Sequence, residues 1–267
     1  MARDGSQQND RNLKGKTAMS GSSGTLYIVG TPIGHPDDIS LRALATLRAV
    51  SIIASEDPRE TQRLLSHHGI TATVTSYGPL HRQEKVRLLL HRLTQGQDVA
   101  LVSDNGSPVI YDPGSQLVAA AHHAGIPVKI IPGPSAMTAA TAISGFSGDA
   151  IVFEGQLPAT SARLAQYLSQ FRTERRTLAF YVDPGALTRL LKTLVQILPT
   201  RQVAIAMNLT TSQEALLRGT AEMLLKEMTG VPKNSVVTVV IEGDGAGNRM
   251  KRTRGKQSRA TLPPGGE

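Results

Sequence analysis

Three loops rich in glycine and proline carry the residues best suited to bind a ligand. They read GTPIG (30–34), SDNGSPVIYDPG (103–114) and PGPSA (132–136), and each directly follows an apolar run. Glycine lets a ligand approach the backbone, and proline stiffens a loop so that less entropy is lost on binding. Asp104 offers acceptors for ribose hydroxyls, and the third loop runs into a helix whose first amides can donate. One such loop is compatible with an ordinary tight turn, but three at one sheet edge indicate a pocket.

A second candidate set consists of Glu56, Asp57 and Arg59, which follow another apolar run. Asp57 precedes Pro58 and fits the N-cap of a helix, which is a structural role. Glu56 and Arg59 have no such role and fall at the same predicted sheet edge, so we take these three residues as the catalytic candidates. Three arginines within 172–176 form a basic group, which is either a solvated face or a contact for phosphate.

What the sequence lacks excludes several classes of site. It has no cysteine, which removes disulfides, thiolate metal sites and iron–sulfur clusters. It has neither GxxxxGK[ST] nor a GxGxxG that opens a helix after the first strand, which argues against nucleoside triphosphates and NAD. The adjacent pairs His67–His68 and His122–His123 fall near predicted helix ends, where neighbouring side chains point apart. We therefore expect no metal site. The scarcity of aromatic residues argues against stacking as the main grip on bases.

The net charge of +8 is concentrated at the two ends of the chain. Residues 1–24 carry +2 and residues 244–267 carry +4, which leaves +2 for everything between. A basic end can gain phosphate contacts on RNA, or it can simply be a solvated tail. We expect both ends to be disordered, because they are polar and the first lacks the apolar region of a signal peptide. No apolar run approaches the roughly 18 residues of a membrane span, so we expect no membrane partner. The lack of cysteine fits the cytoplasmic location that we expect.

Between the ends, strands and helices alternate, which predicts an α/β fold with a parallel sheet covered by helices on both sides. We expect a first α/β domain over 25–147 and a second over 148–243, with the junction at GFSG (145–148). In the second half, VAIAMNLTTSQEALLRG places two strands close together without a helix between them. This spacing predicts a hairpin and a mixed sheet.

Five runs, in this order and spacing, resemble those of the ribosomal RNA small-subunit methyltransferase I family, in the tetrapyrrole (corrin/porphyrin) methylase superfamily. They are GTLYIVGTPIG, ASEDPRETQRLL, VSDNGSPVIYDPG, IIPGPSA and FEGQLP, and the similarity covers about 24–243. The resemblance implies a cleft between two domains that binds S-adenosylmethionine. It also implies methyl transfer to the 2′-oxygen of a cytidine in small-subunit ribosomal RNA, with the 30S subunit as partner and a homodimer as the assembly.

By the same resemblance, the cofactor residues come from both domains. They are Pro32, Asp104, Asn105, Gly106, Ser107, Ser135, Ala136, Tyr181 and Met207.

Three runs of the second half depart from the family. The chain has VDPGA where the family has an ESxHR-like run, MNLT in place of an Arg-Glu-Leu-Thr run, and KNS in place of a KGE-like run. Two alternatives stay open, the first because the chain between its ends carries little net charge and the second because charged groups of the second half are lost. One is a small-molecule methylase of the same superfamily, and the other is a paralogue that binds cofactor or ribosome without catalysis.

Overall fold

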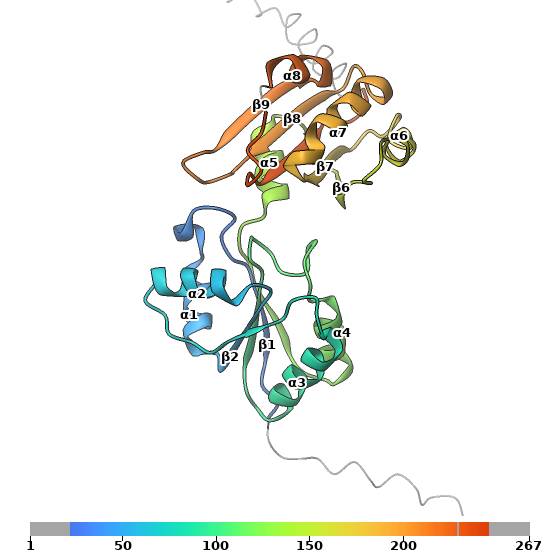
Figure 1. Ribbon diagram of the computed structural model, residues 1–267. Coiled ribbons are helices and arrows are strands. Elements are labelled where there is room, and N and C mark those ends of the chain that lie inside the picture. The colour runs from blue at the N-terminus through green and yellow to red at the C-terminus, as the bar shows by residue number, and fades with distance from the viewer. Residues whose placement is uncertain (1–21, 229, 246–267) are drawn as a thin grey trace, which may run out of the picture.

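The computed structural model describes residues 22–228 and 230–245, which form two lobes, each built on one five-stranded sheet (Figure 1). The predictions of disordered ends concern mainly residues outside these ranges. Among the described residues, no helix combines the length and apolarity needed to cross a bilayer.

The first sheet is entirely parallel, in the order β3-β2-β4-β1-β5. Its strands are β1 (Leu26–Val29), β2 (Ile52–Ser55), β3 (Val74–Ser76), β4 (Val99–Val102) and β5 (Val128–Ile131). Helices lie between consecutive strands: the short 3-10 helix η1 (Pro36–Asp38), α1 (Leu41–Ala49), α2 (Pro58–His67), α3 (Arg82–Thr94) and α4 (Ser115–His123). One apolar cluster contains residues of α3 and α4, and another contains residues of α1 and α2, so the sheet is covered on both faces as the alternation predicts.

The second sheet is mixed, in the order β6-β7-β10-β8-β9. Its strands are β6 (Ile151–Gln156), β7 (Thr177–Val182), β8 (Gln202–Met207), β9 (Ala215–Thr220) and β10 (Val237–Ile241). The pair β6–β7 is parallel, whereas β8 and β9 form the expected antiparallel hairpin. Its helices are α5 (Ala136–Ser144), α6 (Ser161–Ser169), α7 (Pro184–Ile197) and α8 (Ala221–Glu227). The predicted fold class is therefore confirmed for both lobes.

Helix α5 packs on the second sheet, against β7, β8 and β10. Its Ala140 joins Ala204, Ala206 and Val240 of that sheet in an apolar cluster that lies apart from the main core of the lobe. The chain thus crosses from one lobe to the other at 132–135, directly before α5. The boundary predicted at 147/148 is not tested by this packing and stays a prediction.

Two glycines, Gly30 after β1 and Gly133 after β5, let the backbone come into direct contact where these neighbouring strands end. A Cβ added at Gly30 would lie 2.6 Å from the amide nitrogen of Gly133, and one added at Gly133 would lie 2.7 Å from the carbonyl carbon of Gly30. Because both partners are backbone atoms, neither can rotate out of the way.

We predict that Gly30→Ala destabilises the fold by about 1–3 kcal/mol, the usual range for overpacking. Urea unfolding monitored by circular dichroism measures the effect. Gly148→Ala is the matched control, since no atom lies within 4 Å of its added Cβ and its φ is not in the left-handed region. Equal stability of the two variants would contradict the proposed contact.

Candidate active site between the two lobes

The three loops singled out in the sequence meet at the carboxyl edge of the parallel sheet. The amide of Thr31 donates to the carbonyl of Gly106 at 2.9 Å, and the amide of Gly106 donates to the carbonyl of Pro32 at 3.2 Å. The Thr31 hydroxyl adds bonds to the carbonyls of Ser103 and Gly106, at 3.0 and 3.1 Å. Because Gly30 also touches Gly133 of the third loop, the three loops form one continuous surface.

A cavity of about 440 Å³ lies where this surface faces the second lobe. From the first lobe it is lined by Glu56, Asp104, Asn105, Ile110, Tyr111 and Asp112. Beyond the crossing it is lined by Ala136, Gln156, Tyr181, Val182, Asp183 and Ser235. Four carboxyl groups therefore surround one hollow, an environment that favours a cationic ligand.

Asp104 is fixed by the segment after β2. Its Oδ1 accepts from the amide of Asp57 at 3.0 Å, and the Oδ1 of Asp57 accepts from the amide of Arg59 at 2.8 Å as the N-cap of α2. Partial burial raises the pKa of Asp104, and the nearby acidic groups of Glu56 and Asp57 add to the increase. Asp57 thus has the structural role expected from its position, and it also holds Asp104.

Asp112 and Glu56 form a pair of neighbouring carboxyl groups in the cavity. Burial, followed by hydrogen bonding to the Glu56 carboxyl, raises the pKa of Asp112 from 3.8 to about 7. The Oδ2 of Asp112 is buried and has no protein partner. A carboxyl group such as Asp112, which binds and releases a proton near neutral pH beside a second carboxyl group, is suited to general acid–base chemistry.

The loop that carries Asp112 is strained and reaches the second lobe. Val109 and Tyr111 adopt left-handed φ values of 74° and 56°, which cost energy for residues with a Cβ. The Tyr111 ring lies over Gly155 of β6, where an added Cβ would come within 2.6 Å of its Cδ2. It also meets the Tyr181 ring edge to face, with centroids 6.0 Å apart. These contacts close one side of the cavity.

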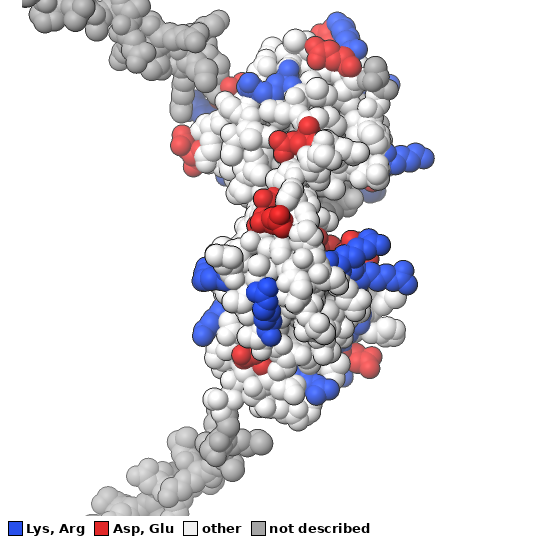
Figure 2. Space-filling model, turned by 90° about the vertical axis from the view of Figure 1, so that its left-hand side faces the viewer, with Lys and Arg blue, Asp and Glu red and all other residues white. Residues whose placement is uncertain are grey.

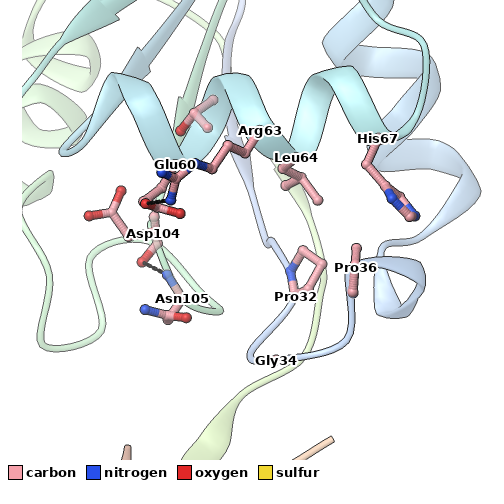
Figure 3. A pocket seen from close by; sticks show the side chains of 11 residues that line it. Pro32, Gly34, Pro36, Glu60, Arg63, Leu64, His67, Asp104 and Asn105 are labelled. Carbon is pink, nitrogen blue, oxygen red and sulfur yellow. Dashed lines mark hydrogen bonds and ion pairs between the residues drawn. The ribbon is translucent and has the colours of Figure 1, made fainter. Parts of the chain in front are cut away.

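A second cavity, of about 330 Å³, shares Ser103, Asp104 and Asn105 with the first. Figure 3 shows Pro32, Gly34 and Pro36 on one side and helix α2 on the other. The α2 residues that line it are Glu60, Thr61, Arg63, Leu64 and His67. The Asp104 loop therefore separates two neighbouring hollows, one between the lobes and one within the first lobe.

The predicted cofactor residues divide into three groups. Asp104, Asn105, Ala136 and Tyr181 line the cavity between the lobes, and Pro32 lines the neighbouring one. Gly106, Ser107 and Ser135 contribute to the packed loop surface, where the Ser107 hydroxyl donates to the Pro134 carbonyl at 3.4 Å. Met207, at the end of β8, packs against the main core of the second lobe.

The three catalytic candidates have different places in the structure. Glu56 lines the cavity, Asp57 positions Asp104, and the Arg59 side chain is exposed at the first turn of α2. The sequence analysis did not predict that Asp112 pairs with Glu56, although Asp112 belongs to the loop 103–114. What distinguishes Asp112 from other aspartates is its burial in the folded chain, which the local sequence does not indicate.

The basic group at 172–176 precedes β7, whereas Val182 at the other end of that strand lines the cavity. Arg176 forms an ion pair with Glu174 at 2.7 Å. At about 3.3 Å per residue, the strand separates this group from the cavity by roughly 17 Å.

His67 and His68 do not point apart, contrary to the expectation from helical spacing. Their rings meet edge to face with centroids 4.8 Å apart. The reason is local: α2 ends at His67, so His68 is its C-cap, with φ −98° and ψ 13°.

Comparisons with known proteins show which family this chain resembles. The family described as Tetrapyrrole (Corrin/Porphyrin) Methylases matches residues 25–225. A curated relative from Thermotoga maritima, named ribosomal RNA small subunit methyltransferase I, is 39% identical over 82% of this chain and 99% of its own length. A relative of the same name from Escherichia coli O157:H7 is 42% identical over 76% of this chain and 72% of its own.

Among solved structures, uroporphyrin-III C-methyltransferase from Thermus thermophilus, complexed with S-adenosylhomocysteine, shares the fold. Its TM-score is 0.58 at 20% identity, and the match covers 82% of this chain and 97% of that one.

We predict that Asp112 makes the fold less stable as the pH rises from about 4 to 7. The raised pKa means that, in this window, the folded chain holds a proton that the unfolded chain has already lost, so the unfolding free energy falls with increasing pH. Asp112→Asn removes this contribution, and its amide can donate to Glu56. Urea unfolding at pH 5 and pH 8 should therefore show a smaller pH-dependent loss for Asp112→Asn than for the wild type. The exposed Asp149→Asn serves as control, and a variant that keeps the full wild-type loss would exclude this role.

Proposed function

The chain belongs to the tetrapyrrole (corrin/porphyrin) methylase family, and we propose that it methylates the ribose 2′-oxygen of a cytidine in small-subunit ribosomal RNA. The observation that carries the proposal is the convergence of three family-like loops on one acid-lined cavity between the lobes. The names of the relatives from Thermotoga and Escherichia support the choice of RNA over a tetrapyrrole.

The cavity suits S-adenosylmethionine. Its carboxyl groups complement a sulfonium cation, and Asp104 offers acceptors to ribose hydroxyls. Ser135 is the N-cap of α5, but its hydroxyl does not accept from the first amides of the helix. Because Ala136 of the same turn lines the cavity, these amides can donate to a ligand there. A Cβ added at Gly106 would lie 3.0 Å from the Ile33 Cγ2 and 3.2 Å from the Pro134 carbonyl oxygen. Glycine at this position therefore lets the three loops pack closely.

We assign cofactor binding to the nine residues that the family resemblance implies. Asp104, Asn105, Ala136 and Tyr181 would contact the ligand, while Pro32, Gly106, Ser107 and Ser135 shape the loops around it. Met207 would act from the end of β8, where it packs against the core of the second lobe.

When bound, S-adenosylmethionine supplies an electrophilic methyl group on a sulfonium. The protein orients the acceptor, limits water and removes a proton. The Glu56 carboxylate accepts the proton of the attacking 2′-hydroxyl, and Asp112 beside it shares that proton. S-adenosylmethionine held between these residues would supply the methyl group to the 2′-oxygen and would leave as a neutral thioether, while the carboxyl groups take up the hydroxyl proton. Asp57 acts through its amide by holding Asp104.

RNA phosphates would remain outside the acidic cavity. Arg59, exposed in the first turn of α2 two residues after Asp57, would offer them a cation. Figure 2 shows further lysine and arginine side chains spread over the lobe of the first sheet, and acidic ones at the waist between the lobes. We also propose that the protein acts in the cytoplasm on the 30S subunit, as a homodimer.

We predict that the purified protein transfers a labelled methyl group to small-subunit RNA and that Glu56→Gln lowers kcat, measured at saturating S-adenosylmethionine, by about 10²–10⁴-fold. Asp104→Ala should instead weaken S-adenosylmethionine binding in calorimetry. Glu222→Gln, on the surface of α8 beside Lys226, is the control. Mass spectrometry of the RNA locates the methyl group. Cofactor binding without transfer to any small-subunit RNA would refute the proposed substrate.

We also predict that kcat/KM rises with pH through about 7, because Asp112, whose pKa burial raises to about 7, must lose its proton before it can share that of the 2′-hydroxyl. Asp112→Asn should flatten this dependence. The measurement is the rate of methyl transfer between pH 5.5 and 8.5, and a wild-type rate that falls over this range argues against the carboxyl pair as base.

A further inference from the structure

Two histidines and an aspartate gather at the outer end of the second cavity. They are His67 at the end of α2, His68 directly after it, and Asp37 in the η1 turn. Each offers one ligand atom, and the three atoms lie within 4.8 Å of one another. In Figure 3 the His67 ring lies at the end of α2, beside the segment that contains Pro36.

The local structure explains why these residues meet. His35 is the N-cap of η1, and its Nδ1 accepts from the Asp37 amide at 3.2 Å, which fixes the turn. The Nε2 of His67 lies 2.9 Å from the Oδ1 of Asp37. The Nε2 of His68 lies 3.1 Å from the Pro36 carbonyl. The turn and the helix end are thus held together by both rings.

The bond to Pro36 also orients a metal-binding nitrogen. A carbonyl can only accept, so the hydrogen of a neutral His68 ring is on Nε2, and Nδ1 keeps its lone pair. Metal-binding histidines commonly have this arrangement, in which one nitrogen donates to a backbone carbonyl while the other faces the ion.

We propose that Asp37, His67 and His68 form a binding site for a divalent first-row transition cation of the zinc type. Two imidazoles and one carboxylate are a donor set typical of zinc and its neighbours, whereas magnesium and calcium prefer oxygen ligands alone. The side chains of Asp37 and His67 are 64% and 48% exposed, so an ion can reach them and water can complete its coordination. Around a tetrahedral ion with bonds of about 2.0–2.1 Å, the ligand atoms lie about 3.3–3.4 Å apart. The 2.9 Å pair of His67 and Asp37 would open slightly to admit the ion, a movement that exposed side chains can make.

A bound ion would fasten the loop after β1 to the end of α2. These two segments supply opposite walls of the second cavity, through Pro32, Gly34 and Pro36 on one side and Leu64 and His67 on the other. The site therefore bears on the rigidity of that cavity, and it is independent of the proposed methyl transfer.

Isothermal titration of the full chain with Zn²⁺ tests the site. The chain has no cysteine, so thiolates cannot contribute to the signal. We expect one tight equivalent for the wild type, and at least tenfold weaker binding for Asp37→Ala and for His67→Ala. The matched control is the His122→Ala, His123→Ala double variant, which removes the other adjacent pair and should bind as the wild type does.

Thermal unfolding gives a second readout that needs no enzymatic activity. Saturating Zn²⁺ should raise the Tm of the wild type and of the control but not that of His67→Ala, and Mg²⁺ should raise none of them. The metal-free variants should keep the wild-type circular dichroism spectrum. The proposal is overturned if Asp37→Ala and His67→Ala bind Zn²⁺ as tightly as the wild type, or if binding is lost in the control.

Discussion

The backbone contact among three loops at the carboxyl edge of the parallel sheet is the constraint on which the site depends. Gly30 and Gly133 allow β1 and β5 to end in direct contact, and the amides of Thr31 and Gly106 link the first loop to the Asp104 loop. These bonds use main-chain atoms, so the shape of the surface is largely independent of side-chain rotamers. The side chains that face the cavity are thereby presented from a rigid base, which is what orientation of two reactants requires.

Two of the three runs that the sequence analysis sets apart from the family pattern, VDPGA and KNS, contribute residues to this cavity, and the structure gives local roles to VDPGA and MNLT. In VDPGA, Asp183 caps α7 by accepting from the Gly185 amide at 2.7 Å while it also lines the cavity. In MNLT, the Asn208 side chain accepts from the Val236 amide at 3.0 Å and so holds the loop before β10. The Asp183 carboxylate and the Asn208 amide thus stabilise local structure in the second lobe. Asp183 also adds an acidic group to the cavity, so both lobes contribute to its acidic lining.

Local patterns sufficed for much of the architecture, and long-range packing accounts for the rest. Apolar runs bounded by glycine and proline correctly predicted the positions of the strands, and Asp57 before Pro58 correctly predicted the start of α2. The position of α5 could not be read in this way, because a helix of small residues fits either sheet and only Ala140 and its neighbours show which one it meets. The same holds for Asp112, whose proton depends on burial by residues distant in sequence.

The lobes are joined by more than the single crossing at 132–135. Gly34 lies so close to the carbonyl of Leu209 that it leaves no space for a side chain, and the His35 amide donates to the Thr210 hydroxyl at 2.8 Å. Under the proposed function, an acceptor nucleotide would reach the hollow beside this seam by leaving its stack. Stacked, base-paired RNA would then be a poor substrate, and the timing of modification would depend on when ribosome assembly leaves that nucleotide unpaired.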